Sequence, residues 1–210
     1  MMPTEPQITS GPRISFPDKD GMTPEQKRVF DGIVNGRRGE LVGPLRAALH
    51  NPELAERWSK LGEILRYYTQ LPPRISELAV LLTARVWNSE LEWTIHRTAA
   101  EAAGLERDII EAIRECQLPP LQFEEDREIY RFTLEMLSLG LVSDEAYAAV
   151  LARWGETGTV ELTALVGYYS MVALTLNTHR IPLPATIAPD LLRGAPQPEG
   201  LTAMPQLVDA

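Results

Sequence analysis

The sequence predicts an all-α protein of about eight helices. In most segments apolar residues recur every three or four positions, the period of a helix with one buried face. Proline and glycine separate these segments at points typical of helix ends, and no stretch has the apolar–polar alternation of a half-buried strand. With 210 residues, 44% of them hydrophobic and 23% charged, the chain is expected to bury one core as a single domain.

Composition narrows the classes of partner. The net charge of −9 argues against a nucleic-acid or anionic-membrane surface, although it leaves room for a local cationic pocket that binds an acid. The single cysteine, Cys116, allows no internal disulfide, which suits a reducing compartment. The first residues lack a basic-then-apolar signal, and the longest uncharged apolar run, residues 162–177, is too short to span a bilayer. We therefore expect a soluble cytoplasmic protein.

The amino-terminal third is expected to contain an arm and three helices. Residues 1–21 hold four prolines and are predicted to be an extended arm. Thr23-Pro24-Glu25 is a helix-start signal, and the helix it begins is expected to end at Asn35-Gly36. After a loop with two adjacent arginines, a short helix carries Arg46 and ends at His50. A longer amphipathic helix over residues 52–70 is expected to bury one face, formed by Leu54, Trp58, Leu61, Leu65 and Tyr68.

Residues 77–96 are predicted to form a central helical hairpin. Leucines at spacings of three and four make the first helix strongly apolar, and the pattern breaks at residues 87–89. Asn88 or Ser89 can cap the second helix, and Ser89-x-x-Glu92 fits a capping box. Glu92 and His96 are four residues apart and therefore share a helix face. With Glu77, they bring three proton-transferring groups into one apolar hairpin.

The remaining helices are expected at residues 106–116, 123–139, 143–154 and 157–179. The broad apolar stripe of the last of these indicates burial on more than one side, including against another subunit. We assign residues 22–184 to one helical domain and residues 185–210 to a proline-rich tail, extended or mobile.

The hairpin carries a family resemblance. Glu77, the segment Asn88-Ser89-Glu90-Leu91-Glu92-Trp93, and His96 with the Ala-Ala-Glu-Ala-Ala-Gly-Leu that follows it resemble the carboxymuconolactone decarboxylase family, which includes the alkylhydroperoxidase-like proteins. The resemblance extends over roughly residues 22–184 and implies the alkylhydroperoxidase-like helical fold. In the peroxidase branch two cysteines stand where this chain has Ser89 and Glu92. Without that pair there is no thiolate to attack a peroxide and no resolving partner.

The resemblance implies catalytic roles for Glu77, Glu92 and His96. Each also has a purely structural explanation. Glu77 can be an acid in a first helical turn, Glu92 the third residue of a capping box, and His96 a buried histidine bonded to a backbone carbonyl. Pocket positions are implied for Ser89, Trp93 and His50, although His50 is equally explained as a helix-capping or packing residue.

The expected activity is that of a cofactor-independent carboxy-lyase resembling 4-carboxymuconolactone decarboxylase. Such an enzyme would act on a small carboxylated lactone or related acid by stabilising an enolate and transferring a proton. An arginine among Arg37, Arg38 and Arg46 is expected to bind the substrate carboxylate. We expect no metal and no cofactor, and the resemblance implies a homo-oligomer, a trimer or hexamer. The alternative is a non-catalytic helical oligomer or small-ligand binder that retains the family frame.

Overall fold

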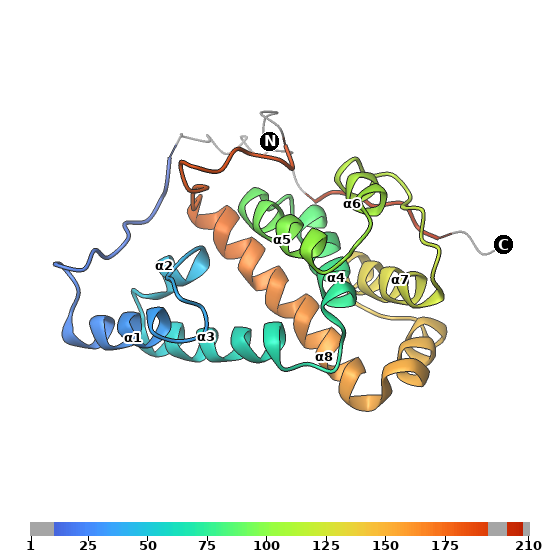
Figure 1. Cartoon of the computed structure of the whole chain (residues 1–210), viewed down its shortest axis with the longest axis horizontal. Helices are drawn as coiled ribbons and strands as arrows, with labels where there is room; N and C mark the ends of the chain where they lie inside the picture. The colour runs from blue at the N-terminus through green and yellow to red at the C-terminus, as the bar shows by residue number, and fades with distance from the viewer. Residues whose placement is uncertain (1–10, 193–200, 208–210) are drawn as a thin grey trace, which may run out of the picture.

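The computed structural model describes residues 11–192 and 201–207, which form helices and no strand (Figure 1). The prediction of an all-α protein is confirmed. The helices are α1 (Pro24–Val34), α2 (Pro44–Ala48), α3 (Pro52–Tyr67), α4 (Pro73–Val86), α5 (Glu90–Ala102), α6 (Arg107–Arg114), α7 (Glu124–Leu139) and α8 (Asp144–His179).

Local sequence explains where these helices begin and end. Four of them, α1 to α4, start with a proline, whose missing N–H costs nothing in a first helical turn. Thr23 and Gln26 form a reciprocal capping box at α1, and the Ser143 hydroxyl caps α8. Gly140 ends α7 in the left-handed conformation. The helix boundary predicted at Trp154-Gly155 appears as a kink inside α8, where Gly155 has φ 65° and ψ −176°.

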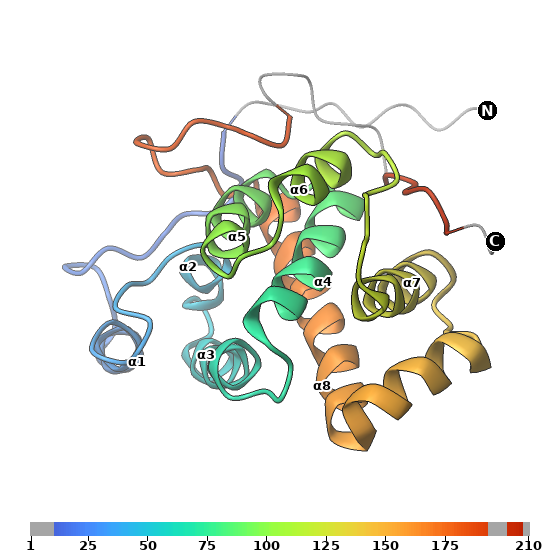
Figure 2. The same ribbon diagram turned by 45° about the vertical axis from the view of Figure 1, so that its right-hand side comes forward.

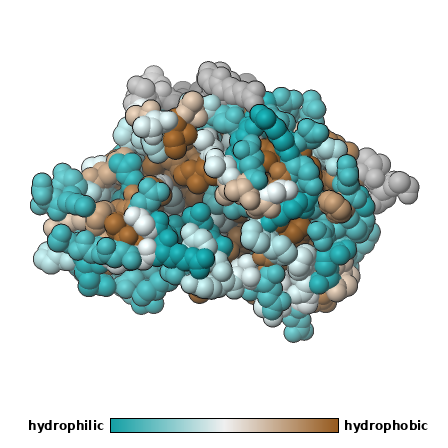
Figure 3. All heavy atoms as spheres, viewed as in Figure 1, coloured by the Kyte–Doolittle hydropathy of each residue, from teal (hydrophilic) through white to brown (hydrophobic). Residues whose placement is uncertain are grey.

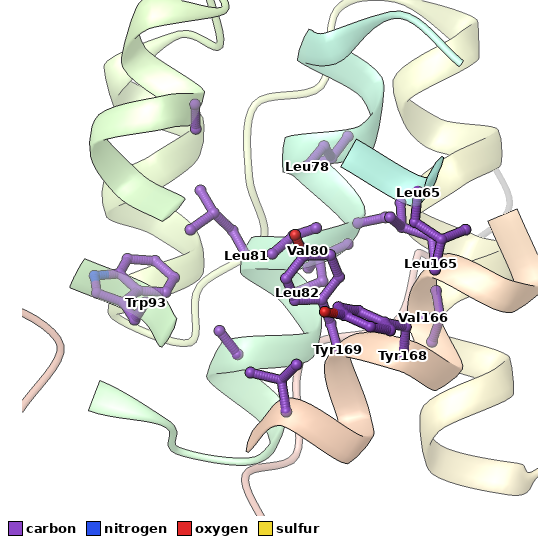
Figure 4. Close-up of a cluster of buried hydrophobic side chains, with 14 of the residues drawn as sticks. Leu65, Leu78, Val80, Leu81, Leu82, Trp93, Leu165, Val166, Tyr168 and Tyr169 are labelled. Atoms are coloured by element: carbon purple, nitrogen blue, oxygen red, sulfur yellow. The ribbon is translucent and has the colours of Figure 1, made fainter. Parts of the chain in front are cut away.

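Helix α4 is the centre of the molecule. Figure 2 shows it with α5 on one side, α7 on the other and α8 behind it, and it packs against all three. Leu78, Leu81 and Leu82 are completely buried in that position. Figure 4 shows Leu81 extending toward Trp93 of α5 and the α4 side chains lying between α5 and the Leu165 and Val166 side chains of α8, so the predicted hairpin is built into the main core rather than standing apart from it.

Helix α8 is long and apolar enough to cross a membrane by length and composition alone. It was expected to be shorter, because the kink at Gly155 was predicted to separate two helices. Half of its most apolar window is buried inside the molecule, against α4 and α7 among others. A core helix of a globular protein has these properties as well.

Helix α3 differs from its prediction in length and in its buried face. It ends at Tyr67, and the Gln70 backbone N–H instead donates to the Glu161 carboxylate. Trp58 and Leu65 are buried as predicted, whereas three other members of the expected face are exposed: Leu54, Leu61 and Tyr68. The buried stripe includes the small residues Ala55, Ser59 and Gly62, and at Gly62 the absence of a side chain leaves room for Tyr168 of α8.

The two terminal segments lie on the helical domain where they are described. In the arm, the Arg13 N–H donates to the His179 carbonyl, which joins the arm to the end of α8. In the tail, the Thr202 N–H donates to the Val86 carbonyl, and the Tyr130 hydroxyl donates to the Pro205 carbonyl. The tail was expected to be extended or mobile, and these parts are extended and bound to α4 and α7. Residues 1–10, 193–200 and 208–210 of the predicted arm and tail lie outside the described residues.

Candidate functional site

A carboxylate–imidazole pair joins the two helices of the hairpin. His96 Nδ1 lies 2.7 Å from Glu77 Oε2, with His96 on α5 and Glu77 on α4. The pair is well shielded, since the two side chains are only 6% and 16% exposed. The chain reverses between them through Asn88, which adopts φ 52°, a left-handed conformation that asparagine tolerates. A carboxylate on Nδ1 orients the ring and leaves Nε2 for a ligand.

Glu92 lies one turn before His96 and is almost completely buried. Neither carboxyl oxygen has a hydrogen-bond partner within the described residues. Burial raises the pKa of Glu92 well above its ordinary range, and the nearby Glu77 charge raises it further. Ser89 lowers this pKa in part, yet its hydroxyl does not reach hydrogen-bonding geometry. Burial thus favours the neutral, protonated form of the Glu92 carboxyl, which is able to donate a proton.

The predicted capping box at α5 is wrong. Ser89 is the residue before the helix, as expected, but its side chain makes no capping bond. The Glu92 carboxyl likewise accepts no hydrogen bond from the Ser89 backbone N–H, because it has no hydrogen-bond partner among the described residues. The structural explanation of Glu92 is thus removed, and a buried, unpartnered acid remains.

Glu92 and His96 line an inner chamber of about 60 Å³ between α2, α5 and α8, whereas Glu77 lies behind His96 and outside the lining. Its polar lining consists of Glu92, His96, Tyr168, Tyr169, Arg38 and Arg66. An outer chamber of about 470 Å³ adjoins it, because the two share a wall that contains Arg38, Gly43, Arg66, Leu91 and Ile95. In the view of Figure 3, brown apolar atoms lie recessed among teal ones on the α2 side of α5.

Two arginines of the chamber wall have no acidic partner in the described part of the chain. Arg38 donates through Nη2 to the Tyr168 hydroxyl at 3.2 Å, while its buried Nε has no partner within the described chain. Arg66 lines both chambers. No carboxylate of the described residues forms an ion pair with either one, in contrast to the paired Arg74 and Arg97. A guanidinium in such a setting is suited to bind a carboxylate ligand.

The other candidate arginines are placed differently. Arg46 lines the outer chamber but not the inner one, and its guanidinium stacks over the Phe16 ring at 3.8 Å. Arg37 stacks over the Tyr67 ring at 4.2 Å and lines neither chamber. Of the three arginines that the sequence left open, only Arg38 reaches the inner chamber.

Three predicted binding residues lie outside both chambers. His50 is exposed, and its Nε2 lies 2.8 Å from the Ser15 carbonyl, so it holds the amino-terminal arm. Trp93 is completely buried and donates its indole N–H to Asp190 at 2.8 Å. Ser89 is buried beside Glu92 but does not line the cavity. Of the predicted binding residues, Arg38 and Arg46 are therefore the two that line a chamber, Arg38 both chambers and Arg46 the outer one.

No pattern in the sequence marks Arg66, Tyr168 or Tyr169 as site residues. Tyr169 belongs to the apolar stripe predicted for residues 157–179 and is expected in the core, whereas Tyr168 lies outside that stripe and is singled out by no motif. The Tyr169 ring packs edge-on against the His96 ring, with centroids 4.7 Å apart and planes at 81°. Because these rings belong to helices distant in sequence, no spacing rule could have joined them.

A metal-binding arrangement of His, Cys, Asp and Glu side chains is absent from residues 11–192 and 201–207. The lone thiol of Cys116 is half-buried after the end of α6 and lines neither chamber. The site therefore offers acid–base and cationic side chains.

Neither a protein-family model nor a curated protein sequence matches this chain. Solved structures do match. The debrominase Bmp8 in complex with 2,3,4-tribromopyrrole is 16% identical, with a TM-score of 0.61 over 77% of this chain and 87% of that one. A peroxidase-related protein from Silicibacter sp. TM1040 is 14% identical, with a TM-score of 0.66 over 87% and 96% of the two chains.

A third neighbour is described as an alkylhydroperoxidase AhpD core, a peroxidase-related protein from Ralstonia eutropha JMP134. It is 12% identical, with a TM-score of 0.66 over 85% of this chain and 95% of that one. These neighbours establish the alkylhydroperoxidase-like fold that the hairpin motif implied. At such low identity they establish the fold and leave the chemistry to be argued from the residues.

Proposed function

We propose that this protein is a cofactor-independent carboxy-lyase that acts on a small carboxylated lactone or a related β-keto or vinylogous acid. The observation that carries the proposal is a buried Glu92 with no partner among the described residues, beside the His96–Glu77 pair in a cavity whose arginines form no ion pair with a described acid. The same fold supports catalysis in the debrominase Bmp8.

The arginines account for substrate entry. A carboxylate that leaves water for an apolar chamber needs a compensating cation. Arg66 and Arg38 line the wall between the two chambers, and the Tyr168 hydroxyl holds the Arg38 guanidinium in place. The substrate would therefore enter as an anion and bind near Arg38.

The reaction then has two steps. The bond between carbon and the carboxylate breaks, CO₂ leaves, and the electron pair moves into the adjacent carbonyl system to give an enolate. The Glu92 carboxyl then transfers its proton to carbon, and the resulting carboxylate takes a proton back from water. Nδ1 of His96 faces Glu77, so Nε2 is available to stabilise the enolate oxygen in the imidazolium form.

A peroxidase has no support in this chamber. The chain has a single cysteine, which cannot form a Cys-x-x-Cys pair and lies outside the chamber wall. Peroxide reduction by this fold would need a thiolate at the site.

CO₂ release from a panel of carboxylated lactones and β-keto acids tests the proposal. Wild type is compared with His96→Ala and Glu92→Gln, and Glu101→Gln serves as the matched control, an exposed acid on the same helix. We expect turnover in wild type and control and a loss of at least about 10²-fold in both site variants. Equal turnover in all four proteins would place the chemistry elsewhere. Ligand binding without turnover on any compound would favour the non-catalytic binder instead.

We also propose that the protein is a homo-oligomer. The outer face of α8 carries Val160, Met171 and Leu174, which are exposed in the single chain. Such a helix face is suited to subunit contact. Light scattering coupled to size exclusion is expected to give a mass above that of one chain, and a monomer mass at micromolar concentration would contradict the proposal.

A further inference from the structure

Tyr169 is a buried tyrosine of the inner chamber to which the two reaction steps above assign no task. Its ring packs edge-on against His96, and Tyr168 packs edge-on against it in turn, with centroids 5.2 Å apart. Figure 4 shows both tyrosines extending from α8 beside the α4 core. The position of the Tyr169 side chain is therefore fixed by aromatic contacts on two sides.

The Tyr169 side chain is only 3% exposed, and no hydrogen bond joins its hydroxyl to another described residue; the hydroxyl is not sealed in the core, because it is not one of the fully enclosed polar atoms that lack a partner. The neighbouring Tyr168 hydroxyl, by contrast, is bonded to Arg38. Buried tyrosines usually find a partner, because leaving the group without one costs free energy. Tyr169 lines the chamber together with Glu92 and His96, so a ligand in the chamber is the natural acceptor for its O–H.

The protonation state of the Tyr169 hydroxyl suits a hydrogen-bond donor. Burial raises the pKa of Tyr169 well above its ordinary value; Arg66 lowers this pKa in part, whereas the charge of Glu77 raises it further. The phenol therefore keeps its proton at neutral pH. It can donate a hydrogen bond, and it can do so without the reorganisation that water would require.

We infer that Tyr169 is a further catalytic residue, which donates a hydrogen bond to the enolate oxygen of the substrate. The inference deepens the proposed function and depends on it for the identity of the oxyanion. Tyr169 contributes a hydrogen bond and transfers no proton, so Glu92 remains the only proton donor to carbon. The acceptor is a planar oxyanion conjugated with a carbonyl, because that is what loss of CO₂ from a β-keto or vinylogous acid produces.

The test uses Tyr169→Phe, which keeps the ring against His96 and removes only the hydroxyl. The matched control is Tyr130→Phe, a completely buried tyrosine whose hydroxyl bonds to the Pro205 carbonyl, away from the chamber. Two readouts are taken. The first is kcat and KM for CO₂ release. The second, which needs no turnover, is the calorimetric affinity for tetronate, a five-membered lactone that is an enolate at neutral pH.

We expect Tyr169→Phe to lower kcat by about 10²-fold with little change in KM, as for loss of one oxyanion donor. Tetronate affinity should fall by about tenfold, which corresponds to one hydrogen bond to a charged group. Tyr130→Phe should change neither quantity. Wild type that binds tetronate in a Tyr169-dependent way without any turnover would refute the lyase and keep the donor. Equal kcat and equal tetronate affinity in Tyr169→Phe and wild type, or no tetronate binding by wild type, would overturn the inference.

Discussion

Glu77 Oε2 and His96 Nδ1 lie 2.7 Å apart although their residues are 19 positions apart in the chain. The contact links α4, the central core helix, to α5, which carries Glu92. It has two consequences. The imidazole is held in one orientation by a group that is itself part of a rigid helix, and the ring nitrogen opposite the contact is left for a ligand.

Removing the charge of Glu77 should therefore reduce turnover without unfolding the protein. Glu77→Gln is expected to lower kcat by about 10²-fold, because the imidazole loses the carboxylate that orients it. Glu77→Asp keeps the charge and should restore part of the rate. Steady-state CO₂ release measures both, with circular dichroism to verify folding. A Glu77→Gln variant with full activity would show that the contact is purely structural.

Glu92 should make stability depend on pH. The folded protein keeps the Glu92 proton, since burial raises its pKa, whereas the unfolded chain releases it above the ordinary value of 4.5. The folded state then binds more protons, so the free energy of unfolding falls as pH rises from the unfolded pKa toward the folded one. The loss is about 1.4 kcal/mol for each pKa unit.

Glu92→Gln removes this ionisation and should flatten the slope. Urea unfolding at pH 5 and pH 8 measures it. The free energy of unfolding of the variant minus that of wild type should be larger at pH 8 than at pH 5. The same dependence on pH in both proteins would mean that Glu92 ionises normally in the fold.

Gly62 provides the space that Arg38 and Tyr168 occupy. A Cβ at this position would clash with the Tyr168 hydroxyl and with Arg38 Nη2. Gly62→Ala should displace the guanidinium and raise KM for an anionic substrate by about tenfold, the value of one charge-assisted hydrogen bond. Gly32→Ala is the control, because Gly32 is also helical and nothing lies within 4 Å of its added Cβ. That control should stabilise the protein by about 0.5–1 kcal/mol, and a KM unchanged by Gly62→Ala would remove Arg38 from substrate binding.

Residues 181–192 form a strap that supplies part of the outer chamber wall, including Pro182, Pro184 and Ile187. The Glu90 carboxylate holds the strap by accepting from the backbone N–H groups of residues 190–192, at 2.7 to 2.9 Å. Glu90→Gln keeps an acceptor but loses the charge, so amide exchange at these three positions should accelerate by about tenfold. Hydrogen exchange with mass spectrometry measures this against Glu101→Gln. Equal protection in both variants would show that other contacts hold the strap.

The helix inventory was accessible from sequence because its signals are local. Pro24 and Pro52 at the starts of α1 and α3 and Gly140 after α7 act within one turn, so these boundaries were predicted where the structure has them. Gly155 was predicted as a helix boundary, and the structure has a kink there inside α8. The buried face of α3 was not predictable in the same way. Leu61 is exposed and Gly62 is buried, the reverse of what their hydrophobicity suggests. The reason is that Tyr168 of α8 lies so close to position 62 that only glycine leaves room for it.

The sequence by itself determined the all-α fold and singled out the acids and the histidine of the hairpin, because periodicity and a short motif are written along one stretch of chain. Tertiary structure decided how they are used. It paired Glu77 with His96, left Glu92 buried with no partner among the described residues, and brought Arg38 and Tyr169 to the same chamber from distant segments. It also moved His50 and Trp93 out of the site. Burial and long-range contact depend on how helices pack, which no local pattern encodes.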